Sequence, residues 1–140
     1  MRTIQGKTIV VTGASSGIGH AIALHLAQKG FTVLATVRKQ TDVVLLNGYN
    51  MPNLLPLCPF DLTDSEQVKI IAGEVKYRIE RNELPLLHAI VNVAGGGQIA
   101  PIELMNVDAY HLELEKRLVG PIVLLQELLP LLRATRGRIV

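Results

Sequence analysis

The chain has 140 residues, of which 49% are hydrophobic, 19% charged and 4% aromatic, and its formal net charge is +2. This length predicts one domain, the hydrophobic content argues against intrinsic disorder, and the small charge with few aromatics argues against a nucleic-acid-binding surface. Cys58 is the one cysteine, which excludes an intramolecular disulfide and a cysteine metal cluster.

Short apolar runs alternate with helical patterns along the chain. We predict strands at residues 7–12, 31–37, 54–60, 87–91 and 137–140, and helices at 20–29, 64–81 and 106–133, the last interrupted near Gly120–Pro121. The strands lack polar alternation, which is typical of strands buried on both faces. Pro56 and Pro59 place the third strand toward a sheet edge, because proline cannot donate to a central ladder. Gly48 and Pro52 weaken a further helical pattern between residues 38 and 53.

This alternation predicts an α/β fold, a Rossmann-type doubly wound parallel sheet of about five strands joined by right-handed crossovers. The longest apolar run, residues 118–125, is shorter than the roughly 20 residues of a membrane-spanning helix. No targeting segment is visible, so we expect a cytoplasmic protein without a membrane partner.

A glycine-rich turn, TGASSGIG at residues 12–19, follows the first strand and opens the first helix. Gly13 permits a tight turn, Gly17 lets the backbone approach a pyrophosphate, and Gly19 allows close helix–strand packing. The free N–H groups of the first helical turn favour phosphate charge. The turn therefore predicts a dinucleotide-binding site, in preference to a tight turn without a ligand.

The spacing G-x-x-x-G-x-G resembles the cofactor loop of the short-chain dehydrogenase/reductase family. Residues 61–63 (DLT) and 92–95 (NVAG) are also similar to that family's segments, as are residues 120–121 and 128–140. The resemblance implies that Asp61 contacts the adenine ring and that the NVAG segment lies beside the cofactor. The candidate cofactor-binding residues are Gly13, Ser15, Ser16, Gly17, Ile18, Gly19, Arg38, Asp61, Leu62, Asn92, Ala94 and Gly95.

The end of the second strand favours NADP(H) over NAD(H). A NAD site places an acidic residue there for the ribose hydroxyls, but residues 31–41 contain no acid and include Arg38 and Lys39. Arg38 can hold a 2′-phosphate with paired donors, which a carboxylate would repel. The alternative is that Arg38 and Lys39 only begin a solvated loop.

The family resemblance also implies an oxidoreductase acting on an alcohol or ketone, most similar to the retinol and hydroxysteroid branch. In that family a tyrosine donates the proton, a lysine four residues later lowers its pKa, and a serine polarises the carbonyl. The tyrosines here, Tyr49, Tyr77 and Tyr110, are followed four residues later by Asn53, Arg81 and Leu114. The serines are Ser15, Ser16 and Ser65, none of which is near the fifth strand. We therefore expect residues 1–140 to be a dinucleotide-binding domain truncated before the catalytic segment and inactive alone.

Two departures from the family pattern bear on catalysis. Residues 115–120 read EKRLVG, so Arg117 stands where the resemblance places a relay asparagine, and Val93 replaces the second asparagine of N-N-A-G. The alternative function is a non-enzymatic module that binds NADP(H) or another protein. An uncovered C-terminal helix and strand edge predict self-association as a homo-oligomer.

Metal binding is not indicated by the histidines. They are isolated, without the spacing of a zinc site and a matching third ligand: His20, His25, His88 and His111. Cys58 lies between prolines and is expected to be a small buried residue rather than a nucleophile.

Overall fold

The computed structural model describes residues 6–97 and 99–140. The strands are β1 (Thr8–Val11), β2 (Thr32–Thr36), β3 (Leu54–Leu57), β4 (Leu87–Val91) and β5 (Arg138–Ile139). The helices are α1 (Gly17–Gln28), α2 (Gln40–Asn47), α3 (Ser65–Glu80), α4 (Val107–Leu114) and α5 (Gly120–Thr135), with a 3₁₀ turn η1 (Ile102–Leu104) and a π-helical segment η2 (Glu115–Val119). All five predicted strands and the three predicted helices are confirmed.

The strands form one parallel sheet in the order β3-β2-β1-β4-β5. β3 lies at an edge, as Pro56 and Pro59 predict, and Pro56 stands opposite Ala35 of β2. The order reverses at β1, from which the chain first moves to β2 and β3 and later returns to β4 and β5. Connections on the two sides of such a switch point leave a crevice at the carboxyl ends of the strands.

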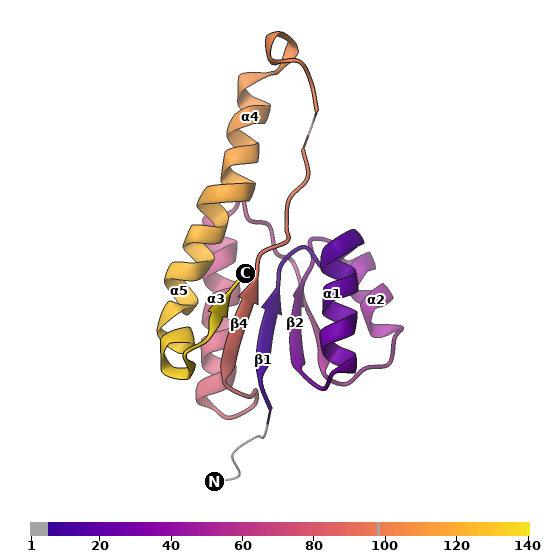
Figure 1. The fold of residues 1–140 in the computed structure, drawn as a ribbon, viewed down its shortest axis with the longest axis vertical. Coiled ribbons are helices and arrows are strands. Elements are labelled where there is room, and N and C mark those ends of the chain that lie inside the picture. Colours follow the sequence, from indigo (N-terminus) through magenta and orange to yellow (C-terminus); the bar gives the residue numbers. More distant parts are fainter. Residues whose placement is uncertain (1–5, 98) are drawn as a thin grey trace.

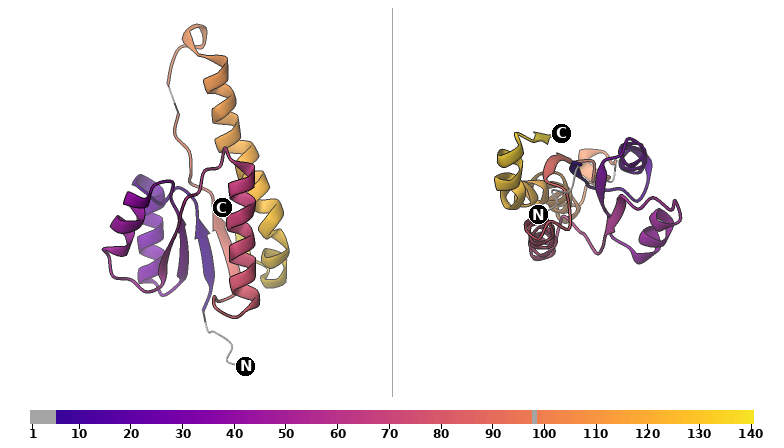
Figure 2. Two further views of the ribbon diagram at one scale, coloured as in Figure 1. Left: turned by 180° about the vertical axis from the view of Figure 1, so that it is seen from behind. Right: turned by 90° about the horizontal axis from the view of Figure 1, so that it is seen from below.

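One face of the sheet packs against α3 and α5 (Figures 1 and 2). Val10, Leu34 and Ile90 project from three neighbouring strands into this layer, where they join Val75 of α3 and Leu128 of α5. All five side chains are buried. Alternate residues of the same strands point the other way, so the apolar strand pattern supplies two cores.

The opposite face packs against α1 and α2. Val11 and Val33 meet Ala23 and Ala27, whose small side chains bring α1 close to the sheet. The sequence pattern gave only weak support for α2, because Gly48 and Pro52 were expected to weaken a helix between residues 38 and 53. Both residues lie beyond the end of α2. Gly48 is the C-cap of this helix.

The long C-terminal helix differs from the prediction in one respect. Asn106 caps it, accepting hydrogen bonds from the Asp108 and Ala109 nitrogens at 2.8 and 3.4 Å. No break occurs at Gly120–Pro121 within the described residues, since the irregularity is the π-helical segment η2 just before them. Pro121 lacks the N–H that an ordinary helical turn would require, which favours the wider turn. Gly120 lies so close to Leu62 that a Cβ there would collide with the Leu62 carbonyl oxygen.

The continuous helix Val107–Thr135 is long and apolar enough to cross a membrane, by length and composition only. The apolar run at residues 118–125, considered in the sequence, is shorter than such a span. Its α5 part buries Leu124, Leu128 and Leu132 within the fold, whereas α4 has no buried residue. In Figure 1, α4 and the connection before it extend beyond the carboxyl end of the sheet.

Candidate functional site

A cleft of about 450 Å³ lies at the carboxyl ends of the central strands, at the switch point of the strand order. Eleven of the twelve candidate residues line it, and Asn92 does not. The lining is Gly13, Ser15, Ser16, Gly17, Ile18, Gly19, Thr36, Val37, Arg38, Phe60, Asp61, Leu62, Val93, Ala94, Gly95 and Lys116.

The three glycines of the turn meet different requirements. Gly13 has φ +68°, and a Cβ on it would lie 2.7 Å from the Cα of Ala94. A Cβ on Gly19 would collide with the Gly13 carbonyl oxygen, so Gly19 serves close helix–strand packing. Gly17 has φ +59° and open space beside it, so its missing side chain leaves room in the cleft.

Two threonines hold the glycine turn against its neighbours. The Thr12 hydroxyl oxygen accepts hydrogen bonds from the Val93 and Ala94 nitrogens at 3.0 and 3.1 Å, which ties the loop after β4 to the end of β1. The Ala14 nitrogen donates to the Thr36 carbonyl at 3.0 Å, which ties the turn to β2. The three loops around the cleft are therefore fixed to one another through the Thr12 hydroxyl and the Thr36 carbonyl.

The N-terminus of α1 opens into the cleft. Ser16 is its N-cap, with an extended backbone, and within the described residues no side chain caps this helix end. The first-turn nitrogens of Gly17, Ile18 and Gly19 therefore face the cleft without a side-chain acceptor. Such a helix end, with glycine leaving space in front of it, fits a phosphate group.

The other end of the cleft carries charge. Arg38 follows β2, Asp61 follows β3, and Lys116 comes from η2. Burial opposes ionisation of Asp61, but hydrogen bonds from the Thr63 nitrogen and hydroxyl at 2.9 and 2.8 Å, with the charges of Arg38 and Lys116, outweigh it and lower the pKa of the Asp61 carboxyl. Asp61 is therefore an ionised acceptor whose carboxylate is stabilised by Thr63 and by the charges of Arg38 and Lys116.

Asn92 lies beside the cleft rather than in its lining. Its backbone and side-chain nitrogens donate to the Val140 carbonyl at 2.7 and 3.3 Å. Its Oδ1 is buried and has no hydrogen-bond partner in the described part of the chain. Asn92 thus joins the ends of β4 and β5, and a direct contact with a cofactor remains a prediction.

Sequence reasoning did not select five lining residues: Thr36, Val37, Phe60, Val93 and Lys116. Three of them directly adjoin candidate residues and Thr36 lies two positions before Arg38, so the strand ends themselves were a usable signal. Val93 lies between Asn92 and Ala94, and Phe60 precedes Asp61. Lys116 is different, because it lies on a helix and only the helix register brings it to the cleft.

The tyrosines lie outside the cleft lining. Tyr49 follows α2, where its hydroxyl is 3.0 Å from His20 Nε2, and Tyr77 is exposed on α3. Tyr110 lines a second cavity of about 290 Å³ between α4 and the connection that includes Gly97 and Met105. Arg117 also lines this second cavity.

The substituted relay position is occupied by an ion pair. Arg117 Nε is 3.0 Å from Glu113 Oε2, and Lys116 Nζ is 3.2 Å from Glu113 Oε1. The hydrogen bond from Lys116 lowers the pKa of the Glu113 carboxyl, partial burial opposes this, and Arg117 adds to the lowering. The Arg117 guanidinium therefore has a carboxylate partner, which it shares with Lys116, at the place where the family resemblance has a neutral amide.

No group of three potential metal ligands is close enough to hold a metal ion within residues 6–97 and 99–140. Burial raises the pKa of the Cys58 thiol, and the nearby Asp42 charge raises it further. A raised thiol pKa makes Cys58 a poor nucleophile.

Comparison with known proteins gives consistent matches. A family model described as short chain dehydrogenase matches residues 7–140. Estradiol 17-beta-dehydrogenase 2 of Rattus norvegicus is 36% identical over an alignment of 140 positions, which covers 98% of this chain and 36% of that protein. The chain spans 36 to 48% of the length of the curated relatives that head the comparison.

Two solved structures illustrate the match in fold. A short-chain dehydrogenase from Streptomyces avermitilis has a TM-score of 0.86 and 29% identity, over 99% of this chain and 49% of that one. An alcohol dehydrogenase from the archaeon Thermococcus sibiricus, complexed with 5-hydroxy-NADP, has a TM-score of 0.81 and 26% identity, over 96% of this chain and 57% of that one.

Proposed function

The chain belongs to the short-chain dehydrogenase/reductase family of oxidoreductases, and on this premise we propose that its cleft binds NADP(H) in preference to NAD(H). The observation that carries the proposal is the cleft itself, which has an open helix N-terminus at one end and Arg38 at the other. A dinucleotide with an extra phosphate on its adenosine ribose matches both features.

The pyrophosphate is assigned to the first turn of α1. Its nitrogens have no side-chain cap in the described residues, and Gly17 leaves space in front of them. Ser15 and Ser16 line the same end of the cleft and offer hydroxyl donors. When bound, the nicotinamide ring supplies or accepts a hydride.

The preference for the phosphorylated cofactor is assigned to Arg38. The end of β2 carries this arginine and no carboxylate, and Arg38 lines the cleft. Arginine binds phosphate with paired donors, whereas a carboxylate there would repel it. The complex of the Thermococcus sibiricus enzyme with an NADP derivative supports the same cofactor class.

Arg38→Ala tests this preference. We expect the dissociation constant for NADPH to rise at least about tenfold, because a charge-assisted phosphate contact is lost, while that for NADH changes little. Lys39→Ala is the control, since Lys39 is exposed beside Arg38 but does not line the cleft. Isothermal titration of both cofactors measures the effect, and an equal loss for NADPH and NADH would contradict the assignment.

We further propose that these 140 residues bind the cofactor without reducing a carbonyl. None of the tyrosines lines the cleft in the described residues, and none has a lysine four positions later. A positioned acid–base pair contributes roughly 10²–10⁴-fold to such a reaction. NADPH oxidation by the purified chain with a panel of ketones, retinoids and steroids checks this, and robust turnover would refute it.

A non-enzymatic NADP(H)-binding or protein-interaction module is the second candidate. It is favoured by the Glu113–Arg117 pair, which puts a bound guanidinium where the family resemblance has a relay amide. A longer chain that carries the tyrosine and lysine tests this second candidate. If Arg117→Asn does not restore carbonyl reduction in that chain, the non-enzymatic function is favoured.

We also propose a cytoplasmic protein that self-associates through the C-terminal helix. Leu112, Leu118 and Ile122 are exposed on that helix, and β5 forms a sheet edge. The leucine stripe of α5 is buried within the fold, whereas a membrane-spanning helix would expose such a face to lipid. A monodisperse monomer in analytical ultracentrifugation would contradict self-association.

A further inference from the structure

Lys116 is the feature of the cleft that the family motifs do not explain. It is the one lining residue that the long helix supplies among the described residues. Its side chain is 33% exposed, and its Nζ lies 3.2 Å from Glu113 Oε1, so the ammonium is partly held by its own helix.

The packing of Gly120 explains why Lys116 reaches the cleft. Gly120 lies so close to Leu62 that a Cβ would collide with the Leu62 carbonyl, which brings this helix against the loop after β3. Lys116 is four residues earlier, nearly one turn away on the same face. It therefore lies over the same loop, where Asp61 precedes Leu62.

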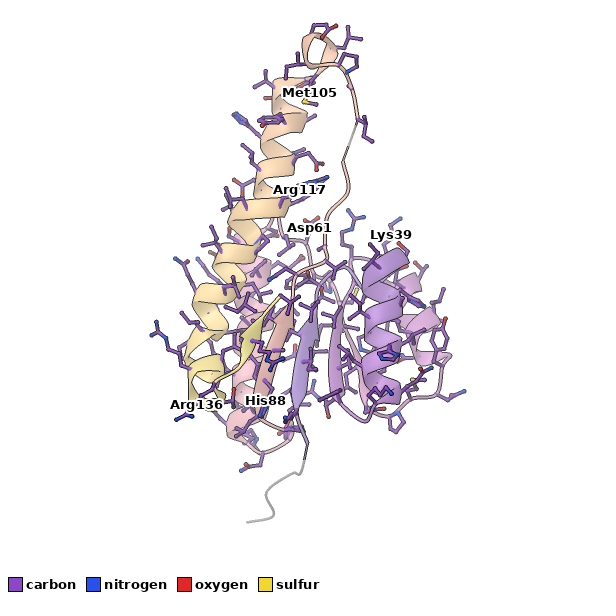
Figure 3. All side chains as sticks on the ribbon, in the orientation of Figure 1. Lys39, Asp61, His88, Met105, Arg117 and Arg136 are labelled. Carbon is purple, nitrogen blue, oxygen red and sulfur yellow. The ribbon has the colours of Figure 1, made fainter. Side chains whose placement is uncertain are left out.

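The charges at this end of the cleft leave a surplus of positive charge. Three lining residues are charged, namely Arg38, Asp61 and Lys116, which gives a sum of +1. Both cations act on the Asp61 carboxylate and lower its pKa. Figure 3 labels Asp61 at the carboxyl end of the sheet, below Arg117 of the long helix in that view.

We propose that Lys116 is a specificity-determining residue, which acts with Arg38 as a second cation on a phosphorylated adenosine end of the dinucleotide. Glu113 holds the Lys116 ammonium when no ligand is present, and an incoming phosphate competes for it. This inference rests on the proposed NADP(H) binding. It goes beyond the assignment of Arg38, because Lys116 lies on the long helix, outside the glycine turn and the end of β2.

Lys116→Met is the test, because methionine keeps an unbranched side chain of similar length without the charge. We expect the dissociation constant for NADPH to rise about five- to twentyfold and that for NADH to stay within about twofold, since only the extra phosphate uses the ammonium. The fragments 2′,5′-ADP and 5′-AMP should reproduce this difference, which locates it at the adenosine end. Lys116→Arg should retain the preference, and Lys39→Met is the matched control for loss of one exposed cation.

The outcomes separate this inference from the proposed function. If wild type prefers NADPH and Lys116→Met keeps that preference in full, or loses both cofactors equally, the role of Lys116 is overturned and the NADP(H) proposal stands. If wild type does not prefer NADPH, both are overturned. Raising the salt concentration should reduce the NADPH preference more in wild type than in Lys116→Met, because screening weakens only a charge that is present. Melting without cofactor verifies that each variant is folded.

Discussion

Gly17 and Gly30 share a backbone conformation but not a location. Their φ angles are +59° and +87°, and neither has an atom within 4 Å of an added Cβ. Gly17→Ala and Gly30→Ala should each lower the free energy of unfolding by about 1 kcal/mol, the usual cost of a side chain in this region. Only Gly17 lines the cleft, so only Gly17→Ala should lose NADPH binding.

Thermal melts and NADPH titrations of the two glycine variants measure these effects side by side. Gly30→Ala is the control, because it carries the backbone strain without touching the cleft. If Gly17→Ala binds NADPH as tightly as wild type, the backbone of this turn does not approach the cofactor.

Asp61 should make stability depend on pH. Its pKa is lowered in the folded chain from the usual value of 3.8, so its ionised form stabilises the fold above that value. This contribution is lost as the pH falls below 3.8 and through the lowered pKa. Asp61→Asn should therefore show a shallower fall in the free energy of unfolding across this acid range.

Urea unfolding of wild type and Asp61→Asn between pH 2 and 6 measures this slope. Above about pH 5 the difference between the two proteins should be constant, because the carboxyl is fully ionised in both folded and unfolded chains. A wild-type slope no steeper than that of the variant would show that Thr63, Arg38 and Lys116 do not stabilise the carboxylate.

At the residue scale, the glycine turn was the most predictable part of the site. Its conformation depends on local sequence, and Gly13, Gly17 and Gly19 have the three different surroundings that their expected roles require. Lys116 was not predictable, because its position depends on the helix register set by η2 and on the approach of Gly120 to Leu62. The Asn92 amide nitrogen donates to Val140, and the expected contact of Asn92 with a cofactor stays a prediction.

At the element scale, α5 is held by its buried leucines. Leu128 is 0% exposed and lies between α3 and the sheet, so Leu128→Ala should lower the free energy of unfolding by about 2–5 kcal/mol. Ile122 on the same helix is 45% exposed, and Ile122→Ala should cost less than about 0.5 kcal/mol. Chemical denaturation compares the two, and equal losses would mean that this helix is not packed on the sheet as described.

Element positions followed from the sequence where local signals agreed. The strand at Leu87–Val91 matches the prediction, and the helix predicted from residue 64 begins at Ser65 with Asp64 as its N-cap, because an apolar run and an acceptor side chain are local features. α2 was undervalued because Gly48 marks its end rather than a break. The π-helical segment was missed because Pro121 was interpreted as an interruption rather than as the cause of a wider turn.

At the scale of the whole molecule, the alternation of strands and helices predicted a parallel doubly wound sheet. It did not predict the strand order, which depends on how both faces of β1 and its neighbours are buried. The order β3-β2-β1-β4-β5 brings the loops after β1 and β4 together, where Thr12 binds the Val93 and Ala94 nitrogens. The cleft is thus a consequence of topology as much as of the glycine turn.

The central claim is that this cleft binds NADP(H), and the melting temperature of the purified chain measured against NADPH concentration tests it most directly. A ligand at 100 times its dissociation constant stabilises the folded state by about 2.7 kcal/mol, which corresponds to about 5–10 °C for a domain of this size. We expect such a rise with NADPH, a smaller one with NADH at the same concentration, and none with NADPH in Gly17→Ala. An unchanged melting temperature at millimolar NADPH, or the same rise in Gly17→Ala, would contradict the claim.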